Sequence, residues 1–430
     1  MKFRIKDHRH HPLFSPNWSR LVVYCFLDIP QWQYKDRTNP FQRRKNDMHD
    51  FVFPAVTLPE SASLLRQQVR EFLQKEKDAG TFTPRKNSWS DGDAAFSRKC
   101  GQAGYIGMVW PKKYGGQERT ALERYVMTEE MLAGGAPVGA HWVADRQSGN
   151  QILRHGSERA RQLILPQIAA GECFFAIGMS EPDSGSDLAA VRTSAVKVEG
   201  GWKITGTKVW TSSAHRAHYL IALVRTAPKE DNRHAGMTQF IVDLKSPGLK
   251  LSPILNIYGA HDWNEVVFDE CFVPDDMVVG EVGGGWNMVT SELAFERSGP
   301  DRFLSTYQLF LASMEQLAEK PDARSVNEIG RFVAHLTTLR RMSTSVAGML
   351  TKGEKPILEA ALVKDIGTAF EREIPEIFRQ LIPSEPLMDN DSLDFDALLG
   401  MSVLKAPGFT IRGGTREILR GMIAKGLGLR

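Results

Sequence analysis

The segment 291–300, SELAFERSGP, contains a carboxylate whose surroundings could give it a chemical role. Val289, Leu293 and Glu296 are spaced i, i+4 and i+7, so on a helix they share one face. A carboxylate in this position can act as a general acid or base when a substrate lies within hydrogen-bond reach. The alternative is a solvated carboxylate at the edge of a helix, paired with water or with Arg297.

A second stretch, 175–187, reads FAIGMSEPDSGSD and combines hydroxyls, acids and backbone N–H groups in a turn-rich context. Glu181-Pro182 restricts the backbone, and Gly185 permits a close approach or a positive φ. A third stretch, 206–213, reads GTKVWTSS and places a large aromatic before three hydroxyl residues. Each is open to two interpretations: a ligand-binding surface, or ordinary turn residues and a core tryptophan at a strand end.

Helical periodicity on both sides of these stretches predicts the elements that must position them. Leu65, Val69, Phe72 and Leu73 form one stripe, with Ser61 or Ser63 as a predicted N-cap. Helical patterns continue through 120–170 and return after 285. There the predicted faces are Phe332, Leu336, Leu339 and Val346, and then Leu362, Ile366 and Phe370.

Between the helical parts the period becomes that of strands. Val196 and Val198 alternate with charged residues, and Gly200-Gly201 predicts a hairpin turn. Further strands are predicted at 219–225, 238–243 and 265–268. Helices, then strands, then helices indicate an α+β fold with segregated elements.

The composition is that of a globular protein without a nucleic-acid surface. The net charge is +3 over 430 residues, with 42% hydrophobic and 24% charged residues. The four cysteines form no CxxC pair, so neither a metal site nor a disulfide framework is predicted, and a cytoplasmic location is expected. The apolar run 21–27 is too short to span a membrane and lacks a cleavage pattern, so we expect no membrane segment and no signal peptide.

Four regions are expected along the chain. Residues 1–55 form an N-terminal extension with no sustained period, interpreted as a translated upstream segment rather than an ordered arm or a partner-binding tail. Residues 56–172 form a helical domain, 173–280 a β domain and 281–430 a helical bundle. An acidic, turn-rich segment at 383–396 predicts an exposed loop in the last region.

The two turn-rich stretches, in this order and spacing, resemble the acyl-CoA dehydrogenase family. The resemblance covers about 60–430 and implies an N-terminal helical domain, a middle β domain and a C-terminal four-helix bundle, with FAD between the last two. The segments that carry it are AIGMSEPDSGSDLAAVRTSA, GWKITGTKVWTSSAH, YGG at 114–116, NEVVFDECFVPDDMVVGEVGGGW at 264–286 and GGTREILR at 413–420.

The resemblance implies roles for residues of both stretches in holding the flavin ring. Met179 and Ser180 would lie against the ring, and Ser180 keeps the hydroxyl of the threonine usual at that position. Trp210 would cover the flavin face, and Ser212 would bond near its N5.

Other residues would contact the remaining parts of cofactor and substrate. Gly185 and Ser186 would line the acyl-CoA channel, with Arg297 as a third substrate-site residue that could orient the base. Thr415 and Glu417 would lie near the adenine dinucleotide part of FAD.

The resemblance also implies which carboxylate would act as the general base that removes the α-proton. Many members carry a glutamate just before Gly-Thr in the C-terminal motif, but this chain has Gly413 there. Isovaleryl-CoA and long-chain acyl-CoA dehydrogenases instead use the Glu of an L-x-x-E-R pattern, which LAFER at 293–297 matches. Glu296 is therefore the predicted base. Glu292 is a weaker candidate, and Glu181 is expected to brace the backbone.

Two histidines and two missing motifs complete the expectations. His215 and His218 are expected to be surface or core residues.

Neither R-x-x-F-G nor Q-x-x-G-G-x-G is present; in the family these motifs hold the FAD diphosphate and adenine of the neighbouring subunit. A heteromer with a related chain, an altered homo-oligomer or a cofactor-poor partner would each explain this. The intact flavin stretches argue against the third.

The resemblance implies dehydrogenation of an acyl-CoA to a trans-2-enoyl-CoA, with electrons passed to an electron-transfer flavoprotein. An acyl-CoA oxidase, and a non-catalytic or half-site subunit of a heteromer, are the alternatives. The place of the base on the first bundle helix suggests a branched, long or bulky acyl group by analogy.

Overall fold

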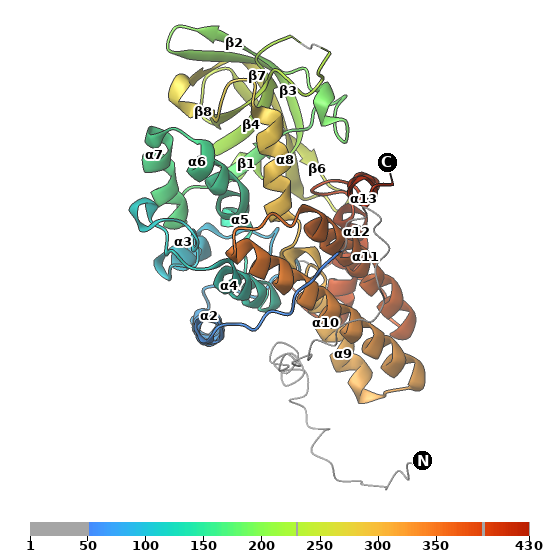
Figure 1. Cartoon of the computed structure of the whole chain (residues 1–430). Helices are drawn as coiled ribbons and strands as arrows, with labels where there is room; N and C mark the ends of the chain where they lie inside the picture. The colour runs from blue at the N-terminus through green and yellow to red at the C-terminus, as the bar shows by residue number, and fades with distance from the viewer. Residues whose placement is uncertain (1–50, 229–230, 389–391, 430) are drawn as a thin grey trace, which may run out of the picture.

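The computed structural model describes residues 51–228, 231–388 and 392–429, and within helix α8 it leaves the side chains of 291–296 undescribed. Residues 1–50 of the predicted extension therefore lie outside the described residues. The order is helices, sheet, helices (Figure 1). This confirms the predicted α+β arrangement. None of the described helices is long and apolar enough to cross a membrane.

The N-terminal helices form because apolar side chains recur at helical spacing. Leu65, Val69 and Leu73 are buried in α2, as predicted. The predicted N-cap is wrong: α2 starts at Glu60 after Pro59, whose carbonyl accepts from Ala62 and Ser63, and there is no side-chain cap. Proline is tolerated here because an amide at a helix start has no helical partner. The helices are α2 (Glu60–Asp78), α3 (Ala94–Gln102), α4 (Ala121–Ala133), α5 (Gly139–Val143), a π-helix (Ala144–Ser148), α6 (Gly149–His155) and α7 (Glu158–Ala169).

The middle of the chain forms one eight-stranded sheet in the order β6-β7-β3-β2-β4-β5-β8, with β1 paired in parallel to β4. The predicted hairpin is present: Val198 pairs with Gly201, and Gly200 takes φ +72°. The strands predicted at 219–225, 238–243 and 265–268 fall in β4, β5 and β7. The strands are β1 (Phe175–Gly178), β2 (Ser194–Val198), β3 (Gly201–Ser212), β4 (Tyr219–Arg225), β5 (Met237–Asp243), β6 (Leu249–Leu255), β7 (His261–Pro274) and β8 (Val278–Val279).

Strand β6 was not predicted. Its sequence contains Pro253, which argues against a central strand because proline has no N–H for the ladder. The structure places β6 at the edge of the sheet, paired only with β7 in the strand order, where proline is tolerated.

The C-terminal helices pack around an aromatic core. Phe332 lies 5.4 Å from Phe378 and 5.7 Å from Phe370 between ring centroids. The face predicted for α10 is buried throughout. The face predicted for α11 is wrong in part, because Ile366 is 40% exposed. The helices are α8 (Gly285–Glu296), α9 (Tyr307–Glu319), α10 (Ala323–Thr351), α11 (Ile357–Leu381), α12 (Phe395–Phe409) and α13 (Arg416–Gly426).

The face of α11 that turns inward carries its small residues. Ala360, Ala361 and Gly367 are buried, and a Cβ on Gly367 would come within 2.5 Å of the Arg302 carbonyl. Close approach of the backbone therefore orients α11, which the apolar stripe alone does not show.

A buried ionic cluster joins the N-terminal helices to α10. Arg340 Nε lies 2.7 Å from Glu129 Oε1, and Arg66 Nη2 lies 3.0 Å from Glu129 Oε2. Arg66 also pairs with Glu130, the next residue of α4. Burial opposes ionisation of Glu129, but Arg340 and Arg66 outweigh it and lower its pKa. The cluster fixes the position of α10 against α2 and α4.

Candidate active site

The turn after β1 is anchored by a buried ion pair. Lys208 is fully buried, and its Nζ donates to Glu181 Oε1 at 2.8 Å and to the Met179 carbonyl at 3.1 Å. The Glu181 carboxylate also accepts from the Arg192 and Thr193 amides, at 2.7 and 2.9 Å. This confirms that Glu181 braces the backbone.

The protonation of this ion pair reflects its burial. Burial lowers the pKa of Lys208 to about 8. Burial also opposes ionisation of Glu181, but Lys208 and the two amides outweigh it and hold the pKa of that carboxyl below its usual value. Glu181 is thus charged at neutral pH and keeps its backbone partners in place.

The same turn is tied to β3, which carries the predicted flavin-contacting tryptophan. The Val209 amide donates to the Ser180 carbonyl at 2.9 Å. Trp210 takes a positive φ of 60° and is 58% exposed, although Thr211 beside it is fully buried. Half-buried Met179 packs in a cluster with Val289 of α8.

Met179 and Ser180 on one side, and Trp210 and Ser212 on the other, thus lie on two segments that are hydrogen-bonded to each other. The exposed indole and the exposed Ser212 give an apolar surface with a hydroxyl at its edge. A large exposed aromatic beside polar groups is typical of a binding surface. These residues fit the flat ring that the resemblance implies.

Gly185 and Ser186 are exposed at the tip of the turn. The positive φ considered for Gly185 is wrong. A Cβ there would meet no other residue within 4 Å, so any close approach would be by a ligand, which stays a prediction. The turn is closed instead by Ser184 Oγ, which donates to the Asp187 carbonyl at 2.8 Å. Both residues are accessible to a ligand.

The C-terminal motif forms a glycine turn before α13. Gly413 and Gly414 take φ of 64° and 95°, a region that favours glycine. Thr415 caps α13 by accepting from the Ile418 amide at 3.4 Å, and Glu417 is exposed in the first turn. Fully buried Lys364 donates from Nζ to the Gly414 carbonyl at 2.7 Å, which holds the turn against α11.

Arg297 connects this turn to α8. Its side chain is 1% exposed, and Nη1 lies 3.2 Å from Met422 Sδ. Its Nη2 would lie 3.5 Å from a Cβ on Gly414. Glu296 is the last residue of α8, directly before Arg297, and its side chain and that of Glu292 lie outside the described residues. The C-terminus of α8 therefore meets the glycine turn.

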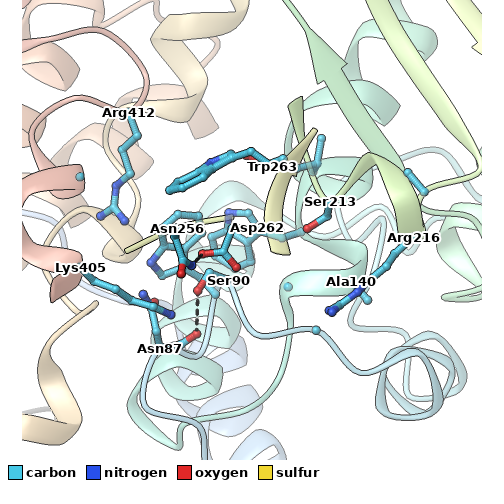
Figure 2. Close-up of a pocket in the computed structure, with 18 of the residues that line it drawn as sticks. Asn87, Ser90, Ala140, Ser213, Arg216, Asn256, Asp262, Trp263, Lys405 and Arg412 are labelled. Carbon is cyan, nitrogen blue, oxygen red and sulfur yellow. Dashed lines mark hydrogen bonds between the residues drawn. The ribbon is translucent and has the colours of Figure 1, made fainter. Parts of the chain in front are cut away.

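A cavity of about 510 Å³ opens beside this turn, between the sheet and both helical parts (Figure 2). Arg412, next to the glycine turn, lines it, as does Ser212 at the end of β3; of the predicted site residues that the structure describes, Ser212 alone is among its lining residues. The aromatic side chains in the wall are Trp89, Trp142, Phe174, Phe175, Tyr258, Trp263 and Phe409.

Arg412 is held in place by the bundle. Its Nη2 donates to Glu371 Oε2 at 2.8 Å and to the Asp301 carbonyl at 2.9 Å, and the guanidinium lies 4.3 Å from the centre of the Trp89 ring. Burial raises the pKa of Glu371, against the opposing effect of Arg412. Arg412 thus joins the cavity wall to the turn that contacts Arg297.

A hydrogen-bonded polar group also lines the cavity. Asp262 Oδ2 accepts from the Tyr258 hydroxyl at 2.8 Å and from Asn256 Nδ2 at 2.6 Å. Burial and Asp262 raise the pKa of Tyr258, so its hydroxyl stays protonated. Sequence reasoning missed these residues because Asn256, Tyr258 and Asp262 lie in the β6–β7 connection and at the start of β7, outside the quoted motifs.

The two histidines of the β3–β4 connection lie near the cavity without lining it. The His215 ring stacks on His261 at 3.7 Å, and His218 Nδ1 accepts from the Phe174 amide at 3.0 Å. Burial is the main cause that lowers the pKa of His215. Both have structural contacts, in agreement with the expectation. Within the described residues, no group of three or more His, Cys, Asp or Glu is placed to hold a metal ion.

Comparison with known proteins identifies the family. Residues 59–172 match the model of the acyl-CoA dehydrogenase N-terminal domain, and residues 176–271 match that of the middle domain. The chain is 31% identical to acyl-CoA dehydrogenase FadE29 of Mycobacterium tuberculosis over 77% of this chain and 86% of that protein. The chain belongs to the acyl-CoA dehydrogenase family. It is an oxidoreductase of this family, whose members are FAD-binding flavoproteins.

Other relatives extend the comparison. Acyl-CoA dehydrogenase FadE34 of M. tuberculosis is 32% identical over 75% of this chain, which spans only 44% of that protein's length. The solved Tcur3481-Tcur3483 steroid ACAD has a TM-score of 0.76 at 26% identity, covering 86% of this chain and 97% of that one. The ChsE4-ChsE5 complex of M. tuberculosis has a TM-score of 0.73 at 26% identity, covering 87% and 98%.

Proposed function

We propose that this acyl-CoA dehydrogenase converts an acyl-CoA into a trans-2-enoyl-CoA, with the Glu296 carboxylate removing the α-proton. The observation that carries the proposal is the contact between the end of α8 and the glycine turn beside the cavity. Arg297, which follows Glu296, lies against Gly414. A glycine at 413 cannot accept a proton, so the base must come from another element that reaches this place.

When bound, FAD supplies the acceptor for the β-hydrogen as hydride at N5. We assign Met179, Ser180, Trp210 and Ser212 to the flavin ring, because two segments hydrogen-bonded to each other present them at a surface where Trp210 and Ser212 are exposed and Met179 and Ser180 half-buried. The buried Lys208–Glu181 pair holds that surface rigid. A rigid surface matters because small displacements of reacting groups are costly in rate.

We assign Gly185 and Ser186 to the acyl-CoA channel and Arg297 to the orientation of the base. Thr415 and Glu417 are proposed to lie near the dinucleotide part of FAD, at the exposed N-terminus of α13, where backbone N–H groups favour an anion. The Thr415 hydroxyl already caps the helix, so its contribution would be to hold that N-terminus in place.

The substrate is proposed to be a bulky acyl-CoA. The cavity of about 510 Å³ supports this, since its aromatic walls offer a wide apolar surface rather than a narrow channel. The steroid ACAD among the structural relatives points the same way.

A heteromer with a related chain is a second candidate assembly, beside an altered homo-oligomer. The absence from the sequence of both motifs that hold the FAD diphosphate and adenine favours it, as does the likeness to the ChsE4-ChsE5 complex. Ile411, Ile418 and Leu429 are 63%, 40% and 67% exposed around α13, an apolar surface that a second chain could cover.

We propose an electron-transfer flavoprotein as electron acceptor. Cys100, Cys173 and Cys271 are free thiols, which supports a cytoplasmic location.

The proposed activity is tested by anaerobic addition of a panel of acyl-CoAs to the purified, FAD-loaded enzyme. Bleaching of the flavin band with formation of enoyl-CoA is expected, and oxygen consumption without added acceptor would instead show an oxidase. A colourless preparation that becomes active only with a second, related chain would show a half-site subunit.

A further inference from the structure

A second cavity, of about 440 Å³, lies between α4, α6 and the C-terminal end of α10 (Figure 1). It shares no lining residue with the cavity of the candidate active site. Four arginines line it: Arg119, Arg124, Arg146 and Arg154. Among the described residues of its wall there is no aspartate or glutamate, so every charged side chain that faces the cavity is positive.

The carboxylates that pair with two of these arginines lie behind the wall. Arg119 Nη1 lies 2.9 Å from Glu123 Oε1, and Arg124 Nη2 lies 3.2 Å from Asp145 Oδ2. Glu123 and Asp145 are buried, and neither lines the cavity. Each arginine uses one nitrogen in its pair, and a guanidinium carries five N–H donors. The other donors of Arg119 and Arg124 are therefore available to a ligand in the cavity.

The turn after α8 places Arg146 in the same wall. Arg146 pairs with Asp301, and a Cβ on Gly299 would clash with its guanidinium. The guanidinium also lies 4.7 Å from the centre of the Trp142 ring. Burial lowers the pKa of Arg146, against the opposing effect of Asp301. An anion in the cavity would favour the charged form of this side chain.

One hydroxyl in the wall has no partner within the fold. Thr128 is 8% exposed, and its hydroxyl makes no hydrogen bond within the part of the chain that the structure describes. Thr128 lies in the middle of α4, so it reaches the cavity through its side chain. Its oxygen is not among the fully enclosed polar atoms. The hydroxyl can therefore donate to a ligand.

This combination of donors matches a phosphate group. Thr120 and Ala121, the N-cap and first residue of α4, also line the cavity, so the positive end of the helix dipole faces it. Guanidinium groups bind phosphate oxygens through two parallel hydrogen bonds, and a phosphate offers three acceptor oxygens to donors that come from different elements. Val109 and Leu350 add apolar wall for an organic part of a ligand.

We propose that this second cavity is a binding site for a phosphate-bearing anion, held by the guanidinium groups of its wall and by the Thr128 hydroxyl. The site lies apart from the candidate active site. The proposal does not depend on the proposed dehydrogenation, because no residue of the second cavity has a role in that reaction.

The test is titration calorimetry on the FAD-loaded full chain at constant ionic strength, with inorganic phosphate, pyrophosphate, ADP and succinate as probes. Pyrophosphate is expected to bind at one site per chain with a Kd below about 1 mM, as two or more charge-assisted hydrogen bonds predict. ADP that binds more tightly than pyrophosphate would support an organic phosphate as the ligand, and the reverse order would support an inorganic one.

Three variants locate the binding, and one serves as a control. Arg119→Gln and Arg154→Gln, both at exposed positions, are each expected to weaken pyrophosphate binding about tenfold. Thr128→Val keeps the shape of the side chain and is expected to weaken it about fivefold without lowering the thermal midpoint, since no hydrogen bond within the fold is lost. Lys113→Gln removes an exposed positive charge outside the cavity and should bind like wild type.

Absence of binding at about 1 mM pyrophosphate would overturn the inference. Affinity that Arg119→Gln and Thr128→Val leave at the wild-type value would also overturn it, because the anion would then bind elsewhere. Succinate that binds as tightly as pyrophosphate would contradict the choice of phosphate. None of these results changes flavin bleaching by acyl-CoA, so the proposed function is judged separately.

Discussion

At the scale of single residues, the site depends on charges buried away from water. Lys208 and Glu181 are 0% and 8% exposed and hold the Met179 carbonyl and two amides. Such a pair adds little net stability compared with apolar residues, but removal of one partner leaves the other charge uncompensated. Its contribution is the fixed position of the turn next to Trp210.

Lys208→Met is expected to destabilise the protein by about 3 kcal/mol and to reduce bound FAD, because Glu181 is then buried without its cation. The free energy of unfolding is measured with urea, and FAD content by absorbance. The double variant Lys208→Met/Glu181→Gln should recover part of the stability. A single variant as stable as wild type would show that the pair does not brace the turn.

At the scale of elements, the proposal that Glu296 is the base requires the glycine turn and the end of α8 to meet. Gly414→Ala is expected to cost about 1–3 kcal/mol, since alanine is strained at φ 95°. Gly330→Ala is the matched control: Gly330 lies inside α10, and a Cβ there meets nothing within 4 Å. That variant should gain about 0.5–1 kcal/mol.

Urea unfolding of the two variants, with their FAD content, checks this prediction. A Gly414→Ala variant that matched Gly330→Ala in stability would show that the turn tolerates another backbone conformation. The link from α8 to the cavity would then need another explanation.

Much of the element order could be predicted from periodicity, whereas the flavin surface inferred from the family motifs stays a prediction. The role of Glu181 in bracing the backbone could be predicted because Glu181-Pro182 lies in a turn-rich segment, where a carboxylate can accept from backbone amides. The inner face of α11 could not be predicted, because close packing of Gly367 decides it.

The cavity could not be predicted either. Asn87, Asp262 and Arg412 are far apart in the sequence, Asp262 at the start of β7 and the other two in turns, and nothing in the local sequence indicates that the fold brings them together.

At the scale of the whole molecule, buried ion pairs join the helical parts that enclose the site. Glu129 and Asp301 are buried carboxylates, 1% and 2% exposed. Burial opposes their ionisation, but Arg340 and Arg66 lower the pKa of Glu129, and Arg146 and Arg302 that of Asp301. A carboxylate whose pKa is lower in the folded than in the unfolded state stabilises the protein above its unfolded pKa, near 4 to 4.5.

This stability is lost as the pH falls from the unfolded-state pKa values through the lower pKa values of the folded state. Acid unfolding should therefore begin below about pH 4. Arg340→Gln is expected to cost about 3 kcal/mol at pH 7, because Glu129 loses one of its two cations. Urea titrations from pH 3 to 7 measure both effects. Stability of wild type that is constant down to pH 3 would contradict the ionised state of these carboxylates.

The measurement that tests the central claim most directly compares Glu296→Gln with Glu292→Gln, one helical turn apart on α8. Both variants are loaded with FAD, and flavin bleaching by an acyl-CoA that wild type oxidises is followed without oxygen. The account predicts that Glu296→Gln keeps its FAD and loses bleaching by about 10²–10⁴-fold, the usual contribution of a general base, while Glu292→Gln bleaches like wild type. Bleaching by Glu296→Gln at the wild-type rate would contradict the account and exclude Glu296 as the base.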